Sequence, residues 1–262
     1  MYSSAYPYKP SCVMITGATG DFGRAFAERF AAIGCRLVLV GHNGGKVAAL
    51  QQDLIDRYAA KVHPCLFDMA DKEGLVRAFS EIPEKYQNID LLINNAGLAL
   101  GLDKAHEAQL DDWETMINVN CLGLVRMTRL VLWGMAERKK GHIINIGSIA
   151  GNYPYPGGNV YCASKAFVKQ FSLSIRADLP GTNVRVTNIE PGAVETQFSK
   201  VRFKGDEERA AQVYENTNNI NADDVAETVF WAATLPEHVN INRLEVMATT
   251  QSFGPNPIER FD

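Results

Sequence analysis

Several features that place a chain in other protein classes are absent from this sequence. Its five cysteines are an odd number, contain no Cys-x-x-Cys pair, and show no metal-ligand spacing with the five histidines. A disulfide framework and a structural zinc site are therefore not expected. We predict free thiols in a reducing compartment, which favours a cytoplasmic location, and we predict no bound metal.

Long apolar runs and an excess of positive charge are missing as well. No run approaches the ~18 apolar residues that a membrane-spanning helix needs. The formal net charge of −4 gives no reason to expect nucleic acid or an anionic membrane as a partner. Residues 1–10 lack the apolar core of a signal peptide, so we interpret them as a flexible N-terminal arm.

Between residues 11 and 250, short apolar runs alternate with amphipathic stretches, with no linker or repeat between them. We expect strands at 11–16, 36–40, 62–67, 89–93, 142–147, 183–189 and 243–248. We expect helices at 21–33, 46–60, 71–81, 110–137, 160–180 and 222–235. Residues 193–217 are polar and irregular, which indicates a flap, and 251–262 form a C-terminal tail.

This alternation is typical of a parallel sheet covered by helices on both faces. Pro64 removes a backbone donor from the third strand, which places that strand at a sheet edge. We therefore predict one α/β domain over 11–250 with a Rossmann fold, a doubly wound seven-stranded parallel sheet in the order 3-2-1-4-5-6-7.

Unusual residues follow the strands, where ligands bind in such a sheet. Gly17, Gly20 and Gly23 follow the first strand, in a turn that either brings backbone close to a pyrophosphate or is a plain strand-to-helix turn. Ser148 ends the fifth strand. In the helix after it, Tyr161 and Lys165 lie on one face, a turn apart. An ammonium beside a phenol favours the phenolate, so we predict a lowered pKa for Tyr161.

Taken together, the segments Thr16 to Gly23 and Asn94-Asn95-Ala96-Gly97, with Asn120, Ser148 and the Tyr161/Lys165 pair, resemble the short-chain dehydrogenase/reductase family. The resemblance covers nearly the whole chain. It implies that Tyr161 is the general acid/base and that Ser148 polarises the substrate oxygen. It also implies that Lys165 lowers the Tyr161 pKa and holds the nicotinamide ribose. Asn120 would position a water in a proton relay to Lys165; the alternative is a structural hydrogen bond.

The same resemblance implies a nicotinamide cofactor. The residues expected to bind it are Gly17, Thr19, Gly20, Asp21, Phe22, Gly23, His42, Asp68, Asn94, Ala96, Gly97, Tyr161, Lys165, Pro191, Gly192, Val194 and Thr196. Asp68 would bond the adenine amino group, cap the 71–81 helix, or do both.

Two departures from the family pattern concern this cofactor. Asp21 replaces the middle glycine of the turn, and we expect its side chain to point away from the pyrophosphate. Gly41 stands where an acid would select NAD, so we favour NADP, with NAD possible. His42 and Asn43 replace the two arginines of similar sequences, and Arg24 and Lys46 are the alternative cations.

Within the family, the resemblance extends to members that oxidise small 3-hydroxy acids of the L-serine, allo-threonine or 3-hydroxypropionate type. The expected substrate-binding residues are Ser148, Tyr155, Tyr161, Arg202 and Lys204. Arg202 and Lys204 either clamp a substrate carboxylate or belong to a solvated loop. Rival functions are a broader carbonyl or 3-oxoacyl reductase and a non-catalytic nucleotide sensor. The family also implies a homotetramer. The 110–137 helix supports this expectation, because it is apolar on more than one face and one sheet cannot cover all of it.

Overall fold

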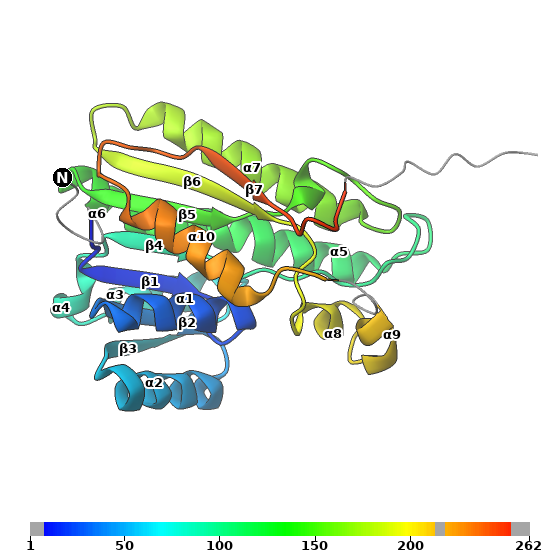
Figure 1. Ribbon diagram of the computed structural model, residues 1–262, viewed down its shortest axis with the longest axis horizontal. Coiled ribbons are helices and arrows are strands. Elements are labelled where there is room, and N and C mark those ends of the chain that lie inside the picture. Colours follow the sequence, from blue (N-terminus) through cyan, green and yellow to red (C-terminus); the bar gives the residue numbers. More distant parts are fainter. Residues whose placement is uncertain (1–7, 213–217, 253–262) are drawn as a thin grey trace, which may run out of the picture.

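The computed structural model describes residues 8–212 and 218–252 (Figure 1). Its strands are β1 (Cys12–Thr16), β2 (Arg36–Gly41), β3 (Lys61–Leu66), β4 (Leu91–Asn94), β5 (Gly141–Ile146), β6 (Val184–Pro191) and β7 (Arg243–Val246). Within these residues they form one seven-stranded sheet in the order β3-β2-β1-β4-β5-β6-β7, with every pairing parallel. The predicted fold class and strand order are confirmed, including the edge position of the strand that contains Pro64.

Helices connect the strands and cover the sheet. They are α1 (Asp21–Ala32), α2 (Gly44–Tyr58), α3 (Lys72–Ser80), α4 (Glu84–Gln87), α5 (Leu110–Ile117), α6 (Leu124–Glu137), α7 (Asn159–Asp178), α8 (Phe198–Arg202), α9 (Glu207–Gln212) and α10 (Ala222–Thr234). Short segments of other helix types are η1 (Asn118–Gly123) and η2 (Ile149–Gly151).

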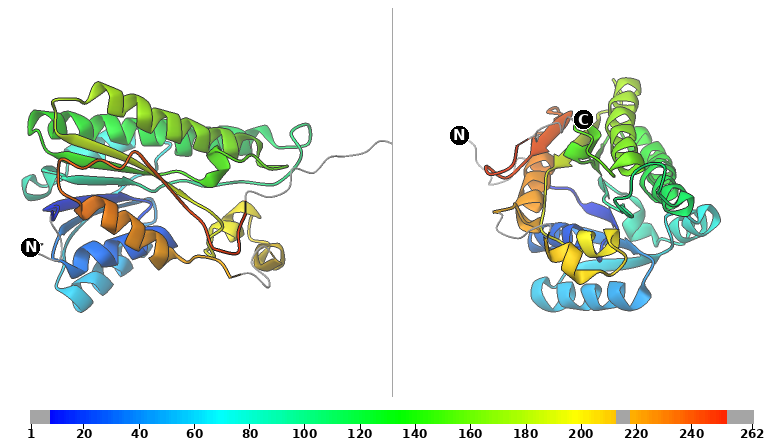
Figure 2. Two further views of the ribbon diagram at one scale, coloured as in Figure 1. Left: turned by 45° about the horizontal axis from the view of Figure 1, so that its top comes forward. Right: turned by 90° about the vertical axis from the view of Figure 1, so that its right-hand side faces the viewer.

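Two apolar layers enclose the sheet, one on each face. On one face α1, α2 and α10 pack together, with Phe30 and Phe230 ring centroids 5.4 Å apart. On the other face α3, α6 and α7 contribute buried side chains such as Met127 and Leu179. Figure 2 shows helices on both sides of the sheet when the molecule is seen along the strands. Continuous burial on both faces explains why the strand sequences are uninterrupted apolar runs.

The region predicted as one helix over 110–137 contains a change of helix type. Residues 118–123 form a π-helical turn between α5 and α6, in which the backbone bonds skip one residue more than in an α-helix. The apolar spacing of this stretch also fits one continuous α-helix, so the sequence pattern does not reveal the turn. It carries Asn120 into the interior of the protein.

Two other segments differ from the irregular structure expected for them. The flap at 193–217 contains the short helices α8 and α9, and its last five residues lie outside the described part. Tyr8, within the predicted arm, donates its backbone N–H to Thr234 and stacks on the Arg185 guanidinium. Residues 1–7 and 253–262, and with them most of the predicted arm and tail, are outside the described residues. In the described part, no helix is long and apolar enough to cross a membrane.

Candidate active site

The residues singled out in the sequence meet at one edge of the sheet. Parallel pairing sets Ile15 opposite Ile93, and Asn94 opposite Asn145, so successive strands end at the same level. Figure 1 shows the flap helices α8 and α9 beyond these carboxyl ends. The segments after β1, β4, β5 and β6 are thereby brought together across long stretches of sequence.

Ser148, Tyr161 and Lys165 form the centre of this edge. Ser148 follows β5 and begins η2, and its side chain hydrogen-bonds that of Tyr161. Both Tyr161 and Lys165 are buried on the inner face of α7. The Lys165 ammonium lies 5.8 Å from the Tyr161 ring centroid and donates to the carbonyl of Ile146 at 2.9 Å. The predicted spacing on one helix face is therefore present.

The predicted lowering of the Tyr161 pKa is wrong in this structure. Burial raises its pKa above the ordinary value, and the neighbouring Tyr155 adds to this effect. The Ser148 hydrogen bond and the Arg202 charge act in the opposite direction but do not outweigh burial. The sequence argument gave the lowering effect to Lys165, but that ammonium is directed at a backbone carbonyl. Desolvation of the phenolate is thus the dominant cause.

The buried ammonium of Lys165 gives a testable dependence of stability on pH. Burial lowers its pKa from 10.5 to about 8, so between these values the unfolded chain binds more protons than the folded one. The free energy of unfolding should therefore rise with pH in this window, because the cost of burying the charge is fully present below pH 8 and is then lost.

Lys165→Met lacks this contribution. We expect the Tm of the variant minus that of the wild type to fall as the pH increases from about 8 to about 10. Thermal unfolding of both proteins across this range measures the difference, and the buried thiols, which titrate in both, largely cancel. A difference that does not change with pH would contradict the assignment.

Asn120 is held by hydrogen bonds within the protein. Its Oδ1 accepts from the Leu98 N–H at 2.9 Å, and its Nδ2 donates to the Leu98 carbonyl and to Ser164 Oγ. These are the structural hydrogen bonds that the sequence left open as an alternative. A Cβ at Gly97 would lie 3.2 Å from Asn120 Oδ1 and 3.5 Å from Lys165 Nζ, so both polar groups flank this glycine. The relay role stays a prediction.

The glycine-rich turn after β1 is tightly packed. Gly17 has φ +62°, and a Cβ at Gly23 would overlap the Gly17 carbonyl oxygen and lie 2.6 Å from Ala18 Cα. Larger residues do not fit at either position without moving backbone. Such a turn leaves the N-terminus of α1 open to an anion, as the motif predicts.

Sequence reasoning gave no role to Thr16 and Asn95, which brace this turn. Thr16 Oγ1 accepts from the N–H groups of Asn95 and Ala96 at 3.0 Å. Asn95 Nδ2 donates to the carbonyls of Thr16 and Gly17 at 3.1 Å. The two motifs are thereby bonded to each other. The glycine-rich turn and the Asn94–Gly97 segment follow two strands that are neighbours in the predicted strand order, and this could have indicated the contact from the sequence.

Asp21 joins the glycine-rich turn to the flap. Its Oδ2 accepts the backbone N–H of Gln197 at 2.6 Å, so the carboxylate is directed at the flap, which agrees with a side chain turned away from the turn's backbone. Of its neighbours, Phe22 packs on Phe26 of the same helix, with ring centroids 6.1 Å apart. Thr19 lies beside Gly41 at the end of β2.

The exit of β2 has few cations free to bind a phosphate. Arg24 is engaged in ion pairs with Glu28 and Asp53, so it is less available than the sequence suggested. His42 is exposed next to Gly41. A Cβ at Gly41 would lie 2.8 Å from Val47 Cγ2, so an acid there would need this side chain to move.

The hydrogen-bond partners of Asp68 and Asn94 exclude some of the roles that the sequence left open for them. Asp68 Oδ1 accepts from the N–H of Ala70, whereas Asp71 caps α3, so the alternative of Asp68 as the helix cap is wrong. Asn94 is buried, and its Nδ2 donates to Thr128 and Asn145. Its side chain therefore faces the interior. The adenosine contacts of both residues stay predictions.

After β6, the chain is held by the last strand and the segment beyond it. The Gly192 N–H donates to Val246, and that of Ala193 donates to Gln251 Oε1 at 2.9 Å. The remaining residues predicted to bind the cofactor in this region are Pro191, at the end of β6, Val194, which bridges to Ile220, and Thr196, whose Oγ1 accepts from Phe198. They lead directly into α8.

The flap lays Arg202 over the ring of Tyr161. The guanidinium carbon is 4.9 Å from the Tyr161 ring centroid, and Nη2 donates to Tyr155 Oη at 2.6 Å. Arg202 Nε is buried and has no hydrogen-bond partner among the described residues. Lys204, in contrast, pairs with Asp112 at 2.8 Å and fastens the flap to α5. Only the first of the two predicted clamp residues is directed at Tyr161.

The parallel sheet, the glycine-rich turn and the Ser148, Tyr161 and Lys165 group define a dinucleotide-dependent oxidoreductase. The sequence pattern of short chain dehydrogenases matches residues 11–207, so the chain belongs to that family and is an oxidoreductase acting on CH–OH groups. The resemblance predicted from the sequence is confirmed. No group of three or more His, Cys, Asp or Glu in the described part is placed to hold a metal.

Individual relatives are similar over almost their full length. The chain is 51% identical over 249 residues to the NADP-dependent 3-hydroxy acid dehydrogenase YdfG of Salmonella typhi, covering 95% of this chain and 99% of that one. It is 46% identical over 249 residues to sulfoacetaldehyde reductase 2 of Chromohalobacter salexigens, covering 95% and 98%. Among solved structures, the closed form of serine dehydrogenase complexed with NADP+ matches with a TM-score of 0.91 and 49% identity, over 95% of this chain and 100% of that one.

Proposed function

We propose that this protein is an NADP-dependent dehydrogenase of small 3-hydroxy acids. The observation that carries the substrate class is Arg202, whose guanidinium lies over Tyr161 with a buried Nε that lacks a partner in the described structure. A planar guanidinium with free donors is suited to a carboxylate. Bound there, a small hydroxy acid would present its hydroxyl group to Tyr161 and Ser148.

The catalytic roles follow from the groups around Tyr161. In oxidation Tyr161 must act as the phenolate, which takes the proton of the substrate hydroxyl, and in reduction it acts as the neutral phenol, which gives its proton to the carbonyl oxygen. Because burial raises the pKa of Tyr161, the phenolate needed for oxidation is favoured at high pH. The Ser148 hydroxyl, already bonded to Tyr161, stabilises the charge that develops on the reacting oxygen. Lys165 contributes positive charge behind the phenol and would hold the nicotinamide ribose, and Asn120 would position a relay water beside it.

The structure fits the cofactor at the glycine-rich turn, where a Cβ at Gly20 would meet only the Gly17 carbonyl oxygen, at 3.6 Å, so the N-terminus of α1 is left uncovered. NADP, when bound, supplies the acceptor of the hydride from the hydroxyl-bearing carbon. The N-terminus of α1 would hold the pyrophosphate, and the segments at Asn94 and Pro191 would flank the nucleoside and the nicotinamide. NADP is favoured over NAD because Gly41 leaves the end of β2 without an acid, because the 3-hydroxy acid dehydrogenase named above is NADP-dependent, and because the serine dehydrogenase is complexed with NADP+.

A second candidate substrate class follows from the similarity to a sulfoacetaldehyde reductase. A sulfonate carries the same negative charge as a carboxylate and would also bind the Arg202 guanidinium. We therefore assign Arg202 to an anionic group and favour the carboxylate, because the more similar of the two named relatives is a hydroxy acid dehydrogenase.

An assay of NADP reduction with a panel of alcohols tests the proposal. We expect turnover with L-serine, allo-threonine and 3-hydroxypropionate, a lower rate with 2-hydroxyethanesulfonate, and little with a neutral alcohol of the same size. NAD should replace NADP poorly. A preference for the sulfonate would mean that hydroxy sulfonates, and not 3-hydroxy acids, are the substrate class. A preference for the neutral alcohol would favour a broad carbonyl reductase. No turnover with any substrate would leave the non-catalytic sensor.

Assembly and location are also part of this proposal. The exposed apolar side chains on α6 and α7, Trp133 and Phe167, support a homotetramer in which these helices are covered. The five cysteines are buried free thiols, which supports a reducing, cytoplasmic compartment.

A further inference from the structure

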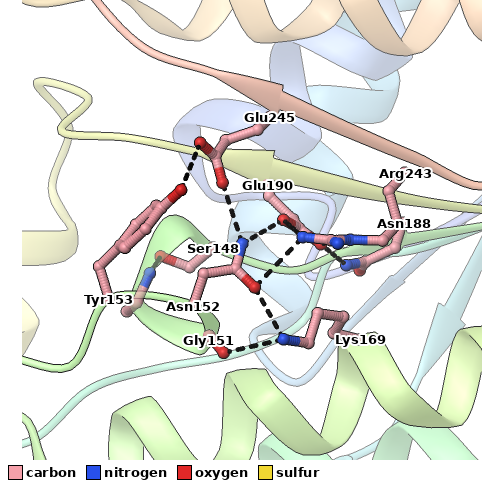
Figure 3. Close-up of polar contacts among 10 residues, drawn as sticks. Ser148, Gly151, Asn152, Tyr153, Lys169, Asn188, Glu190, Arg243 and Glu245 are labelled. Carbon is pink, nitrogen blue, oxygen red and sulfur yellow. Dashed lines mark hydrogen bonds and ion pairs between the residues drawn. The ribbon is translucent and has the colours of Figure 1, made fainter. Parts of the chain in front are cut away.

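A network of charged and amide groups lies next to the Ser148 turn and centres on the side chain of Asn152 (Figure 3). Its Nδ2 donates to Glu190 Oε2 at 2.6 Å and to Glu245 Oε2 at 2.9 Å. Its Oδ1 accepts from Lys169 Nζ at 2.7 Å and from Arg243 Nη2 at 3.2 Å. One amide thus donates to two carboxylates and accepts from two cations. A side chain there must both donate and accept.

Glu190 fixes the inner side of the network. It is 1% exposed, and both of its oxygens are occupied by Arg243, with Asn188 and Asn152 as further donors. Burial alone would raise its pKa, but these hydrogen bonds leave the pKa below its ordinary value. An ionised, fully bonded carboxylate has little freedom to move. Glu190 directly precedes Pro191, one of the residues predicted to bind the cofactor.

A rigid turn connects Asn152 to Ser148. Ser148 Oγ accepts from the N–H of Ala150 at 3.1 Å, and the Ser148 carbonyl accepts from that of Gly151 at 3.0 Å. The Asn152 N–H in turn donates to the Ile149 carbonyl at 2.8 Å. A displacement of Asn152 is therefore transmitted to the serine through one short helical turn.

The turn also rests on the catalytic helix. A Cβ at Gly151 would lie 2.8 Å from the backbone carbon of Lys165, so the two segments are in close contact. One turn further along α7, Lys169 donates to the Gly151 carbonyl at 3.3 Å as well as to Asn152. Tyr161, Lys165 and Lys169 recur at four-residue spacing on one face of α7. The first two serve the chemistry, and the third fastens the serine turn to the same helix.

We propose that Asn152 is a positioning residue that, through Glu190 and Lys169, fixes the Ser148 hydroxyl against the Tyr161 phenol. The inference rests on the proposed role of Ser148 at the reacting oxygen and adds what holds that hydroxyl in place. Neither the family pattern of motifs nor the roles assigned above include this network. Misplacement of a catalytic group by a fraction of an ångström is enough to slow catalysis.

A double-mutant cycle with Ser148→Ala tests the proposal in the full-length protein. Asn152→Asp keeps the size of the side chain, loses both donated hydrogen bonds and adds charge beside Glu190 and Glu245. In the otherwise wild-type enzyme we expect it to lower kcat/KM for the best hydroxy acid about tenfold or more. In the Ser148→Ala background, the same change should lower kcat/KM by less than about twofold, because the group it positions is gone.

Lys169→Met, run through the same cycle, provides a second variant in case Asn152→Asp does not fold. Asp90→Asn is the matched control, because Asp90 is another buried carboxylate, bonded to Ser11 and Lys140 at the opposite end of the sheet. We expect the control to lower Tm without lowering kcat/KM.

Equal losses in both Ser148 backgrounds, or a comparable loss in the Asp90→Asn control, would overturn the positioning role and leave the proposed function intact. Unchanged kcat/KM in Ser148→Ala alone would instead refute the role of the serine in the proposed function. The two failures are therefore distinguishable within one set of measurements.

Discussion

Tyr161→Phe should lower kcat about 10²- to 10⁴-fold, the usual contribution of a general acid/base. The change removes one oxygen from a residue that is 9% exposed and keeps the ring that packs against Phe198 and Arg202. The stability of the variant should therefore change little. Its activity should fall, because the phenylalanine ring has no oxygen that can accept the proton of the substrate hydroxyl. Steady-state rates in both directions, with NADPH affinity measured by fluorescence, check this expectation.

Tyr86→Phe is the matched control. Tyr86 is also buried, and it packs against His63 in the apolar layer away from the site. Its variant should keep wild-type turnover. If Tyr161→Phe retained turnover within about threefold of the wild type, its catalytic role and the oxidoreductase mechanism built on it would be wrong.

Arg202→Ala should raise KM for hydroxy acids about 10- to 100-fold and change KM for neutral ketones little. A hydrogen bond to a charged group is worth about 1.5–3 kcal/mol, which corresponds to this range. In the wild type the Arg202 charge lies over Tyr161 and lowers the pKa of that phenol. The variant removes this charge, so the Tyr161 pKa should rise further. The pH profile of alcohol oxidation should accordingly move to higher pH.

Two matched variants sharpen the Arg202 experiment. Arg202→Lys keeps the charge but not the planar donors, so its KM for hydroxy acids should lie between those of wild type and Arg202→Ala. Arg209→Ala removes another flap arginine, which stacks on Phe203 away from Tyr161, and should have no effect. Equal losses for acidic and neutral substrates would mean that Arg202 orders the flap without binding the substrate anion.

The sequence predicted the fold well because the deciding signals were local. Continuous apolar strands, Pro64 at an edge strand and alternation with helices are sufficient to define the sheet and its order. The signal that placed Tyr161 and Lys165 on one helix face was local too, since both lie on α7. The π-helical turn at 118–123 was missed, because the apolar spacing there also fits one continuous α-helix.

Contacts between distant segments were not accessible from the sequence. Lys204 seemed as suited to a carboxylate as Arg202, and only the fold shows that Asp112 neutralises it. The Tyr161 pKa was misjudged because the burial that raises it depends on how completely the surrounding segments enclose the ring. Asn152 carried no motif at all, since its partners come from β6, β7 and α7.

The brace between Asn95 and the glycine-rich turn has a consequence for folding. The turn follows the first strand, but its supporting amide comes from a segment almost 80 residues later in the chain. A nascent or truncated chain that stops before Asn95 has the glycine motif without the support that shapes it. We therefore expect nucleotide affinity to develop only once β1 and β4 have paired, and we expect bound nucleotide to stabilise the β1–β4 pairing as well as the turn.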